Sequence, residues 1–263
     1  GKPRADQACR EVFGRLQGHE CIYIDEPVSP AKIAEHPDAE IVSIFVSSAL
    51  HKEHIDALPA LKLIVARSTG VDNIDVVHAK EKGIVVANVP KYGAHTVAEF
   101  AFALILALSR RIVEASNQVR EDGNFKTGAL EGFDLFGKTI GVIGTGAIGR
   151  SSVAIAQGFG MKVLMYDLFP NKSLESANAS YVSLPELLAQ SDVVTLHAPY
   201  TPETKHILNA DAFSKMKKGA FVINTARGEL IDNEALIDAL KNGTVAGAGL
   251  DVLEGERLLK DEI

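Results

Sequence analysis

The segment KTIGVIGTGAIGRSSVAIAQGFGMKVLMYD, residues 138–167, decides the fold predicted for this chain. Residues 138–143 form an apolar, β-branched run that predicts a buried strand. Residues 152–159 have the apolar periodicity of a helix, and Gly160 stands where that helix would close. Residues 162–166 predict a second strand. The segment therefore predicts a strand, a glycine-rich turn, a helix and a second strand in direct succession.

The turn between the first strand and the helix has the sequence Gly144-Thr145-Gly146-Ala147-Ile148-Gly149, a G-x-G-x-x-G pattern. We expect Gly144 to make the tight turn, Gly146 to let backbone amides approach a pyrophosphate, and Gly149 to let the helix pack closely on the strand. The N-terminus of that helix offers unpaired N–H groups and a positive dipole end to phosphates. A glycine-rich turn that binds nothing is the alternative, and the complete context disfavours it.

An acidic residue ends the second strand. Asp167 lies 18 residues beyond Gly149, about where a dinucleotide fingerprint places the acid that binds the ribose. Its carboxylate can accept hydrogen bonds from the ribose hydroxyls of NAD, and its charge would repel the 2′-phosphate of NADP. The sequence therefore predicts an NAD site rather than an NADP site.

Composition indicates an ordinary globular protein and excludes several function classes. With 263 residues, 46% of them hydrophobic, the chain is long enough for two domains with sizeable cores. A net charge of −7 offers no electrostatic footprint for nucleic acid or an anionic membrane. Cys9 and Cys21 lack metal-ligand or redox spacing, and no apolar run is long enough to span a membrane. We expect a cytoplasmic protein without a signal peptide and without a metal site.

The first ninety residues alternate predicted strands with predicted helices, which implies a second parallel α/β domain. Thr69 and Gly70 follow one of these strands, and their backbone amides could bind a carboxylate there; a plain strand-to-helix turn is equally compatible. Prolines at positions 27, 30 and 37 punctuate the link between the first two strands. The expected strands are residues 20–25, 41–46, 61–66 and 84–87, and the expected helices are residues 1–16, 54–58 and 76–82.

A breaker-rich segment, residues 88–93, predicts the hinge between the domains, which places the boundary at residues 91 and 92. The helix predicted over residues 96–111 has Thr96 and Glu99 at capping-box spacing. Its apolar residues almost surround the axis, so it must be buried either between domains or against a second subunit. We favour the subunit interface, and we expect residues 121–136 to form a surface loop that embraces the partner.

Two groups of polar residues follow predicted strands beyond the fingerprint. Arg227 comes after the strand at 220–224, and Asp251, Glu254 and Glu256 come after the strand at 245–250. An arginine fork matches a carboxylate and its charge polarises an adjacent carbonyl. A salt bridge on a loop is the alternative for Arg227, and a solvated loop is the alternative for the acids. The remaining predicted elements are a strand at 193–196 and helices at 184–190, 212–216 and 233–241.

Six linked motifs run along the sequence: RSTGVDNID, NVPKYGAHTVAEFAFALILALSRR, GVIGTGAIGR with Asp167, HAPYTPET, INTARGELID and GAGLDVLEGE. Together they resemble the D-isomer-specific 2-hydroxyacid dehydrogenase family over about residues 41–256. The second motif is most similar to the D-lactate dehydrogenase branch.

The resemblance implies two Rossmann-like domains with parallel sheets. Residues 1–91 would be a flavodoxin-like substrate domain, and residues 92–263 an NAD-binding Rossmann domain with a dimerisation helix and loop. It also implies a homodimer that interconverts a D-2-hydroxy acid, such as D-lactate, and its 2-keto acid by hydride transfer between NAD and the substrate.

The resemblance assigns roles to particular residues. Arg227 would bind the substrate's carboxylate and carbonyl, and Glu256 would be the catalytic acid. Thr69 and Gly70 would hold the carboxylate by backbone amides, and Tyr92 would line the pocket. The implied cofactor-binding residues are Gly144, Gly146, Ala147, Ile148, Gly149, Asp167, Ala198, Pro199, Thr204, Thr225, Ala226 and Asp251.

The sequence departs from the family in one respect. The family pairs its catalytic glutamate with a histidine from a segment well beyond it, and none of the eight histidines occupies that position. We expect those of the first domain (His19, His36, His51, His54 and His78) to lie on the surface. We therefore expect the sequence to be part of a longer chain. The second hypothesis is an NAD-binding regulator or scaffold that keeps the fold and lacks turnover.

Overall fold

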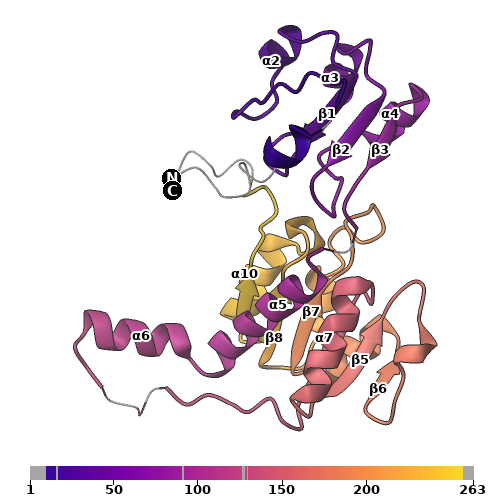
Figure 1. Cartoon of the computed structure of the whole chain (residues 1–263). Helices are drawn as coiled ribbons and strands as arrows, with labels where there is room; N and C mark the ends of the chain where they lie inside the picture. Colours follow the sequence, from indigo (N-terminus) through magenta and orange to yellow (C-terminus); the bar gives the residue numbers. More distant parts are fainter. Residues whose placement is uncertain (1–9, 16, 91, 126–127, 129, 257–263) are drawn as a thin grey trace. The chain divides into compact units, whose positions relative to one another are not determined.

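A computed structural model of the chain describes residues 10–15, 17–90, 92–125, 128 and 130–256 (Figure 1). It divides into two compact units, residues 1–92 and 93–263. Within the predicted helix at 1–16, residues 10–13 are helical, and residues 1–9 and 16 lie outside the described part. Cys9 and Lys91 of the predicted hinge lie outside it as well.

The first unit contains a parallel sheet in the order β1-β2-β3. Its apolar side chains, among them Leu50 and Ile64, form one buried core. The three strands fall within predicted ranges, because each is an apolar run bounded by turn residues. The strands are β1 (Ile41–Ile44), β2 (Leu63–Ala66) and β3 (Val85–Ala87), and the helices are α2 (Pro30–Ala34), α3 (Lys52–Asp56) and α4 (Val76–Glu81).

The strand predicted over residues 20–25 is wrong. The structure shows an irregular segment there, with Ile22 54% and Ile24 44% exposed. Alternation of apolar and polar residues produces a strand only where a sheet edge can pair with it, because an isolated strand leaves its N–H and C=O groups unpaired. Among the described residues, no strand pairs with this segment.

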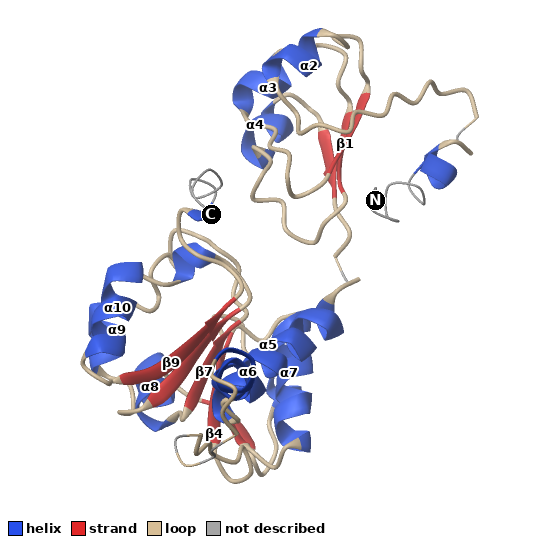
Figure 2. Ribbon diagram, turned by 90° about the vertical axis from the view of Figure 1, so that its left-hand side faces the viewer, coloured by secondary structure: helices blue, strands red, loops and turns tan. Residues whose placement is uncertain are grey.

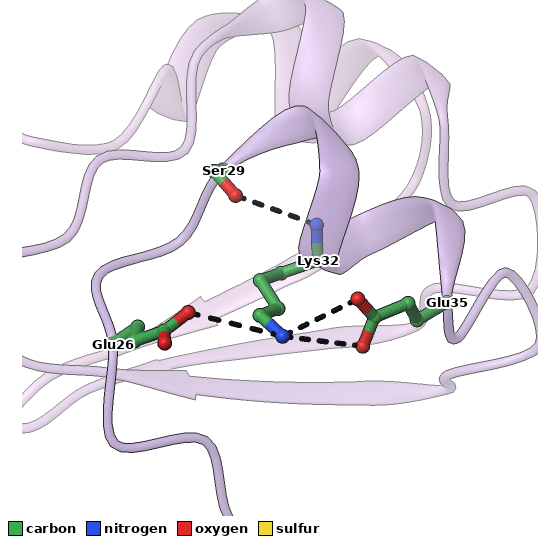
Figure 3. Close-up of polar contacts among 4 residues, drawn as sticks. All are labelled: Glu26, Ser29, Lys32 and Glu35. Carbon is green, nitrogen blue, oxygen red and sulfur yellow. Dashed lines mark hydrogen bonds and ion pairs between the residues drawn. The ribbon is translucent and has the colours of Figure 1, made fainter.

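Helix α2 is absent from the predicted elements, because the prolines at positions 27, 30 and 37 predict an irregular link. Figure 3 shows why the chain is helical here: the Ser29 hydroxyl accepts a hydrogen bond from the Lys32 N–H (3.4 Å). A proline at the first helical position is compatible with this cap, since its missing N–H would have no partner there. The Lys32 ammonium lies 3.3 Å from Glu35 and 3.8 Å from Glu26, two exposed ion pairs that contribute little to stability.

The surface position predicted for His78 is also wrong. Its side chain is buried, and its Nε2 lies 2.9 Å from the Asp56 carboxylate. Hydrogen bonds from Lys82, then from His78, lower the pKa of Asp56 to about 2. Helix α4 thus carries a buried imidazole, and the polar atoms of its ring are paired with neighbouring charged side chains, among them Asp56 of α3.

The second unit is a six-stranded parallel sheet in the order β6-β5-β4-β7-β8-β9. The chain runs outward from β4 to β6 and then returns to β7 on the other side of β4. The strand order therefore changes direction between β4 and β7, where open parallel sheets bind ligands. The strands are β4 (Thr139–Ile143), β5 (Lys162–Tyr166), β6 (Ala179–Tyr181), β7 (Val193–Leu196), β8 (Ala220–Asn224) and β9 (Val245–Leu250).

Helices cover both faces of this sheet, and an apolar core lies on each side (Figure 2). α5 (Ala94–Ser109) and α7 (Ala147–Gly158) pack on one face. α8 (Leu184–Gln190) and α10 (Asn233–Lys241) cover the other, beside α9 (Ala210–Ser214). Side chains cap the N-termini of α8, α9 and α10, which the sequence places within two residues of the observed bounds. Within the described ranges, no helix combines the length and the apolar character needed to cross a membrane.

The capping box predicted at Thr96 and Glu99 is wrong, because α5 already begins at Ala94 with Gly93 as a cap that has no side chain. Thr96 therefore lies inside the helix. One side of α5 packs against α7 and the strands β8 and β9, while Phe100 on the other side is 44% exposed. The apolar pattern around the axis thus includes a strip that the second unit itself leaves uncovered.

Helix α6 (Ile112–Glu121) was not predicted and has no buried residue. Figure 1 shows it extending away from the layers of the second unit. Its Ile112 and Val119, seven residues apart and so on the same face, are 52% and 49% exposed. The segment that follows α6, up to residue 136, has no regular structure in its described part, as expected for the predicted loop.

Candidate active site

The glycine-rich turn lies where β4 meets α7, against the end of β7. Gly144 has a φ of 90°, and a Cβ on it would come within 2.5 Å of the Ala198 backbone nitrogen. Glycine is therefore required at this tight turn for two reasons: the left-handed backbone, and the close contact with the residues that follow β7. A Cβ on Gly149 would overlap the Gly144 carbonyl oxygen, whereas the nearest atom of β4 is 3.5 Å away. The absence of a side chain at Gly149 therefore matters mainly for its contact with Gly144 within the turn, and less for packing of the helix on β4.

Helix α7 begins at Ala147, five residues earlier than predicted, with Gly146 as its N-cap. The prediction begins later because, apart from Ile148, residues 147–151 are small or polar and add little to the apolar periodicity. The N–H groups of Ala147, Ile148 and Gly149 belong to the first turn and have no acceptor in the described part of the chain. A Cβ on Gly146 would meet nothing within 4 Å. Open space beside free amides at a helix N-terminus fits a pyrophosphate.

A buried imidazole ties β7 to α7 beneath this turn. His197 donates its backbone N–H to the Ile143 carbonyl (2.8 Å), and its Nε2 shares a hydrogen bond with the Ser152 hydroxyl of α7 (2.9 Å). Burial lowers the pKa of His197 to about 4, so the ring is neutral at neutral pH. The two elements that flank the turn are therefore linked through their side chains as well as through the sheet.

Asp167 reaches back to the turn from the end of β5. Its Oδ2 accepts hydrogen bonds from the N–H (2.6 Å) and the hydroxyl (2.9 Å) of Thr145, and its Oδ1 accepts from the Phe169 N–H (2.8 Å). Burial alone would raise the pKa of this carboxyl, but these donors outweigh it and hold the pKa below its ordinary value. The group is therefore a fixed anion at the edge where the ribose is expected.

Arg227 follows β8 on a turn that the sequence did not explain. The buried Asn224 accepts from the Ala226 N–H (3.0 Å) and donates to the Arg227 carbonyl (2.8 Å), so its amide sets the course of the chain. The Arg227 guanidinium donates to the Ala226 carbonyl (2.7 Å). The hydroxyl of Thr225 is buried without a partner in the structure, as expected of a group that a ligand would satisfy.

The loop after β9, residues 251–256, is more ordered than a solvated loop. The Asp251 N–H donates to the Asn224 carbonyl (2.9 Å), which anchors the start of the loop beside the Arg227 turn. The Glu256 carboxylate accepts from the Leu253 N–H (3.0 Å), and the Glu254 carboxylate is paired with His206 (2.9 Å). The side chains of Asp251 and Glu256 are exposed. Asn224 and His206 are the residues to which the sequence assigned no role: Asn224 stands in the INTARGELID motif without a chemistry of its own, and His206 follows the HAPYTPET motif as a lone histidine.

The loop after β7 holds the other predicted cofactor residues. Ala198 is buried, Pro199 is exposed, and the Thr204 hydroxyl donates to the Pro199 carbonyl (2.7 Å). The Thr204 side chain therefore stabilises the loop to which it belongs. Nowhere in the described part of the chain do three or more His, Cys, Asp or Glu side chains converge as a metal ion would require.

The predicted substrate residues of the first unit lie after β2 and at its last residue. The Thr69 hydroxyl donates to the Val89 carbonyl (3.0 Å) and the Asn88 amide donates to the Thr69 carbonyl (2.7 Å), so the loop is fixed to the segment after β3. Within the described ranges, the N–H groups of Thr69 and Gly70 have no acceptor. The side chain of Tyr92 is 66% exposed.

The family model described as D-isomer specific 2-hydroxyacid dehydrogenase, NAD binding domain, matches residues 102–263. A 2-hydroxyacid dehydrogenase homolog of Haemophilus influenzae is 46% identical over 87% of this chain and 69% of that protein. The chain belongs to the D-isomer-specific 2-hydroxyacid dehydrogenase family. It is therefore an NAD-dependent oxidoreductase, and the predicted fold class and cofactor are confirmed.

Other relatives show the range of this family. The D-lactate dehydrogenase of Escherichia coli is 44% identical over 83% of this chain and 67% of that protein. A solved D-lactate dehydrogenase of Aquifex aeolicus, in complex with NAD and lactic acid, superposes with a TM-score of 0.90 at 40% identity, over 98% of this chain and 77% of that one. Relatives at 39% and 42% identity are named glyoxylate reductase and hydroxypyruvate reductase.

Two glycines of α7 give a matched test of the cofactor turn. Replacing Gly149 with Ala forces the Cβ into the Gly144 carbonyl and must shift the turn, so NADH affinity should fall at least tenfold, measured by NADH fluorescence. Replacing Gly158 with Ala, on the same helix with nothing within 4 Å, should leave NADH affinity unchanged and raise stability by about 0.5–1 kcal/mol. Equal NADH affinity in the two variants would show that the close contact does not shape the binding turn.

Proposed function

We propose that the protein interconverts D-lactate and pyruvate, and accepts other small 2-keto acids less well. The observation that carries the proposal is Arg227, which Asn224 holds at the carboxyl edge of the NAD-binding sheet, next to the loop that bears Glu256. A guanidinium at that edge is suited to a substrate with a carboxylate beside a carbonyl. The similarity of residues 88–111 to the D-lactate dehydrogenase branch supports pyruvate as the preferred keto acid.

On the substrate side, the Arg227 guanidinium binds the carboxylate in a forked geometry and polarises the neighbouring carbonyl. In the first unit, we assign the free amides of Thr69 and Gly70 to a substrate carboxylate and Tyr92 to the lining of the substrate pocket. We assign the unit at residues 1–92 to substrate binding and the unit at residues 93–263 to cofactor binding. These assignments account for why each unit presents unpaired amides at the ends of its strands.

On the cofactor side, the amides of the first turn of α7 bind the pyrophosphate and the Asp167 carboxylate binds the adenosine ribose. When bound, NAD accepts a hydride from the hydroxy acid or NADH delivers one to the keto acid. The hydroxyl of Thr225 is satisfied by the nicotinamide side of the cofactor. The complete set of proposed cofactor residues is Gly144, Gly146, Ala147, Ile148, Gly149, Asp167, Ala198, Pro199, Thr204, Thr225, Ala226 and Asp251.

Reduction of a keto acid also requires a proton at the carbonyl oxygen. We assign Glu256 to this step, as the carboxylate that raises the proton affinity of an imidazole so that it serves as a general acid near neutral pH. In the family, that histidine comes from a segment well beyond the glutamate. An NAD-binding regulator without turnover is the second candidate, and the assay of keto acid reduction described below separates the two.

We further propose that the protein is a homodimer whose interface includes α6 and the exposed strip of α5. A helix of ten residues is marginal in water on its own, and none of the residues of α6 is buried by the described part of its own unit. The exposed Ile112 and Val119 give it one apolar face for a second copy of the chain.

The dimer can be tested with two variants that each add one negative charge to α6. Val119→Glu places the charge on the apolar face and should convert a dimer into a monomer, because the buried charge would have no partner. Asn117→Glu places it on the opposite face and should leave the dimer intact. Light scattering gives the mass of each variant; a monomeric wild type, or two variants that dimerise equally, would contradict the proposal.

Arg227→Gln tests the substrate site in the full-length protein. The substitution removes about two charge-assisted hydrogen bonds, worth ~2 kcal/mol each, so kcat/KM for pyruvate should fall about a thousandfold. NADH affinity should stay within a factor of about two, because Arg227 is assigned to the substrate. The measurement is NADH oxidation at 340 nm with a panel of 2-keto acids, repeated with NADPH.

Arg15→Gln, an exposed arginine of the first unit, is the control and should behave like wild type. Full activity of Arg227→Gln would refute the role of Arg227. A wild type that binds NADH but reduces none of the keto acids would favour the regulator. Preference for glyoxylate or hydroxypyruvate would keep the reaction and correct the substrate.

A further inference from the structure

His206 and Glu254 join two loops at the carboxyl edge of the second unit's sheet. The Nε2–H of His206, on the loop after β7, donates to Oε1 of Glu254, on the loop after β9, at 2.9 Å. Their side chains are 31% and 30% exposed, so the contact is partly shielded from water. The strands that carry these loops are not neighbours, because β8 lies between them.

The backbone of His206 is fixed to the segment that follows Arg227. Its N–H donates to the Glu229 carbonyl (2.9 Å), and two residues later the Leu208 N–H donates to the Leu230 carbonyl (3.1 Å). His206 has a φ of 50°, a left-handed conformation that is unfavourable for a residue other than glycine. Such a conformation persists where surrounding contacts impose it, and these backbone hydrogen bonds supply the contacts.

The Arg227 turn and the loop after β9 also meet directly. A Cβ on Gly228 would overlap the backbone of Leu253 and Glu254, so the two segments are packed main chain against main chain. The amide of Asn233 donates to the Glu254 carbonyl (3.3 Å). Leu253, which precedes Glu254, is 41% exposed, Gly255, which follows it, has no side chain, and Glu256 is exposed. Glu254 is therefore the main side-chain anchor of the loop.

We propose that His206 and Glu254 are positioning residues that hold the loop 251–256 against the Arg227 turn. The pair fixes the position of Glu256 relative to Arg227. Glu256 lies two residues beyond Glu254, and Arg227 lies one residue before Gly228. This inference rests on the roles proposed above for Arg227 and Glu256. It extends them by proposing that the loop 251–256 is held in place by its contact with the loop after β7, which also contains Thr204.

The test compares two amide substitutions of His206 that differ by one methylene, in the full-length protein. His206→Gln places a donor near the position of Nε2 and should keep the contact, with kcat/KM for pyruvate within about threefold of wild type. His206→Asn tolerates the left-handed backbone but is too short to reach Glu254. We expect His206→Asn to lower kcat/KM about tenfold, mainly through kcat, because it displaces the loop 251–256 and leaves the glycine-rich turn in place.

Glu254→Ala should give a similar loss, and the double variant with His206→Asn should lose no more than either single change, because both remove the same contact. Amide hydrogen exchange supplies a readout independent of turnover: exchange over residues 251–256 should accelerate in His206→Asn and Glu254→Ala and stay slow in His206→Gln. Lys205→Ala, an exposed neighbour on the same loop, is the control and should match wild type in both measurements.

The outcomes separate this inference from the proposed function. Absence of keto acid reduction by wild type would overturn the proposed function and the inference that rests on it. An active wild type with unchanged turnover or unchanged loop exchange in His206→Asn and Glu254→Ala would overturn the inference alone. Additive losses in the double variant, or equal losses in His206→Asn and His206→Gln, would also overturn it.

Discussion

The contact of main chain with main chain between the glycine-rich turn and the end of β7 is the constraint on which the second unit depends. Gly144 passes so close to Ala198 that no side chain fits between them, and Gly149 closes the turn on the Gly144 carbonyl. The first turn of α7 is thereby brought to the carboxyl edge of the sheet with its amides unpaired. The hydrogen bond between Ser152 and His197 stabilises this arrangement. This packing provides the phosphate site that we propose, without any charged side chain.

The residues to which we assign the chemistry lie at the same edge, because parallel strands deliver the residues that follow them to one side of the sheet. Asp167 after β5, Arg227 after β8 and Glu256 after β9 are far apart in sequence and are brought to this edge by strand order alone. Their precision comes from neighbours that have no chemistry of their own in the motifs: Thr145 holds Asp167, and Asn224 holds the turn of Arg227. A dehydrogenase site of this kind is assembled from loops whose positions are set by a rigid sheet.

The sheet of the second unit could be predicted almost completely, because its buried parallel strands are short apolar runs separated by capped helices. The exceptions have physical causes. The three residues of β6 are too few for a periodic signal, and α6 lacks the buried face that periodicity detects. The apolar alternation at residues 20–25 finds no partner strand. The glycines, Asp167 and Arg227 could be recognised from local context, whereas the pairing of His206 with Glu254 depends on the left-handed backbone at His206 and on two non-adjacent strands.

We propose that this edge of the sheet holds NADH so that its hydride reaches the face of a small 2-keto acid whose reduction gives the D-hydroxy acid. A label test uses NADH that carries deuterium at both C4 positions of the nicotinamide, with full-length protein and pyruvate. The product is analysed by mass spectrometry after chiral separation. We expect D-lactate with deuterium at C2. Formation of L-lactate, lactate without the label, or no product despite NADH binding would contradict it.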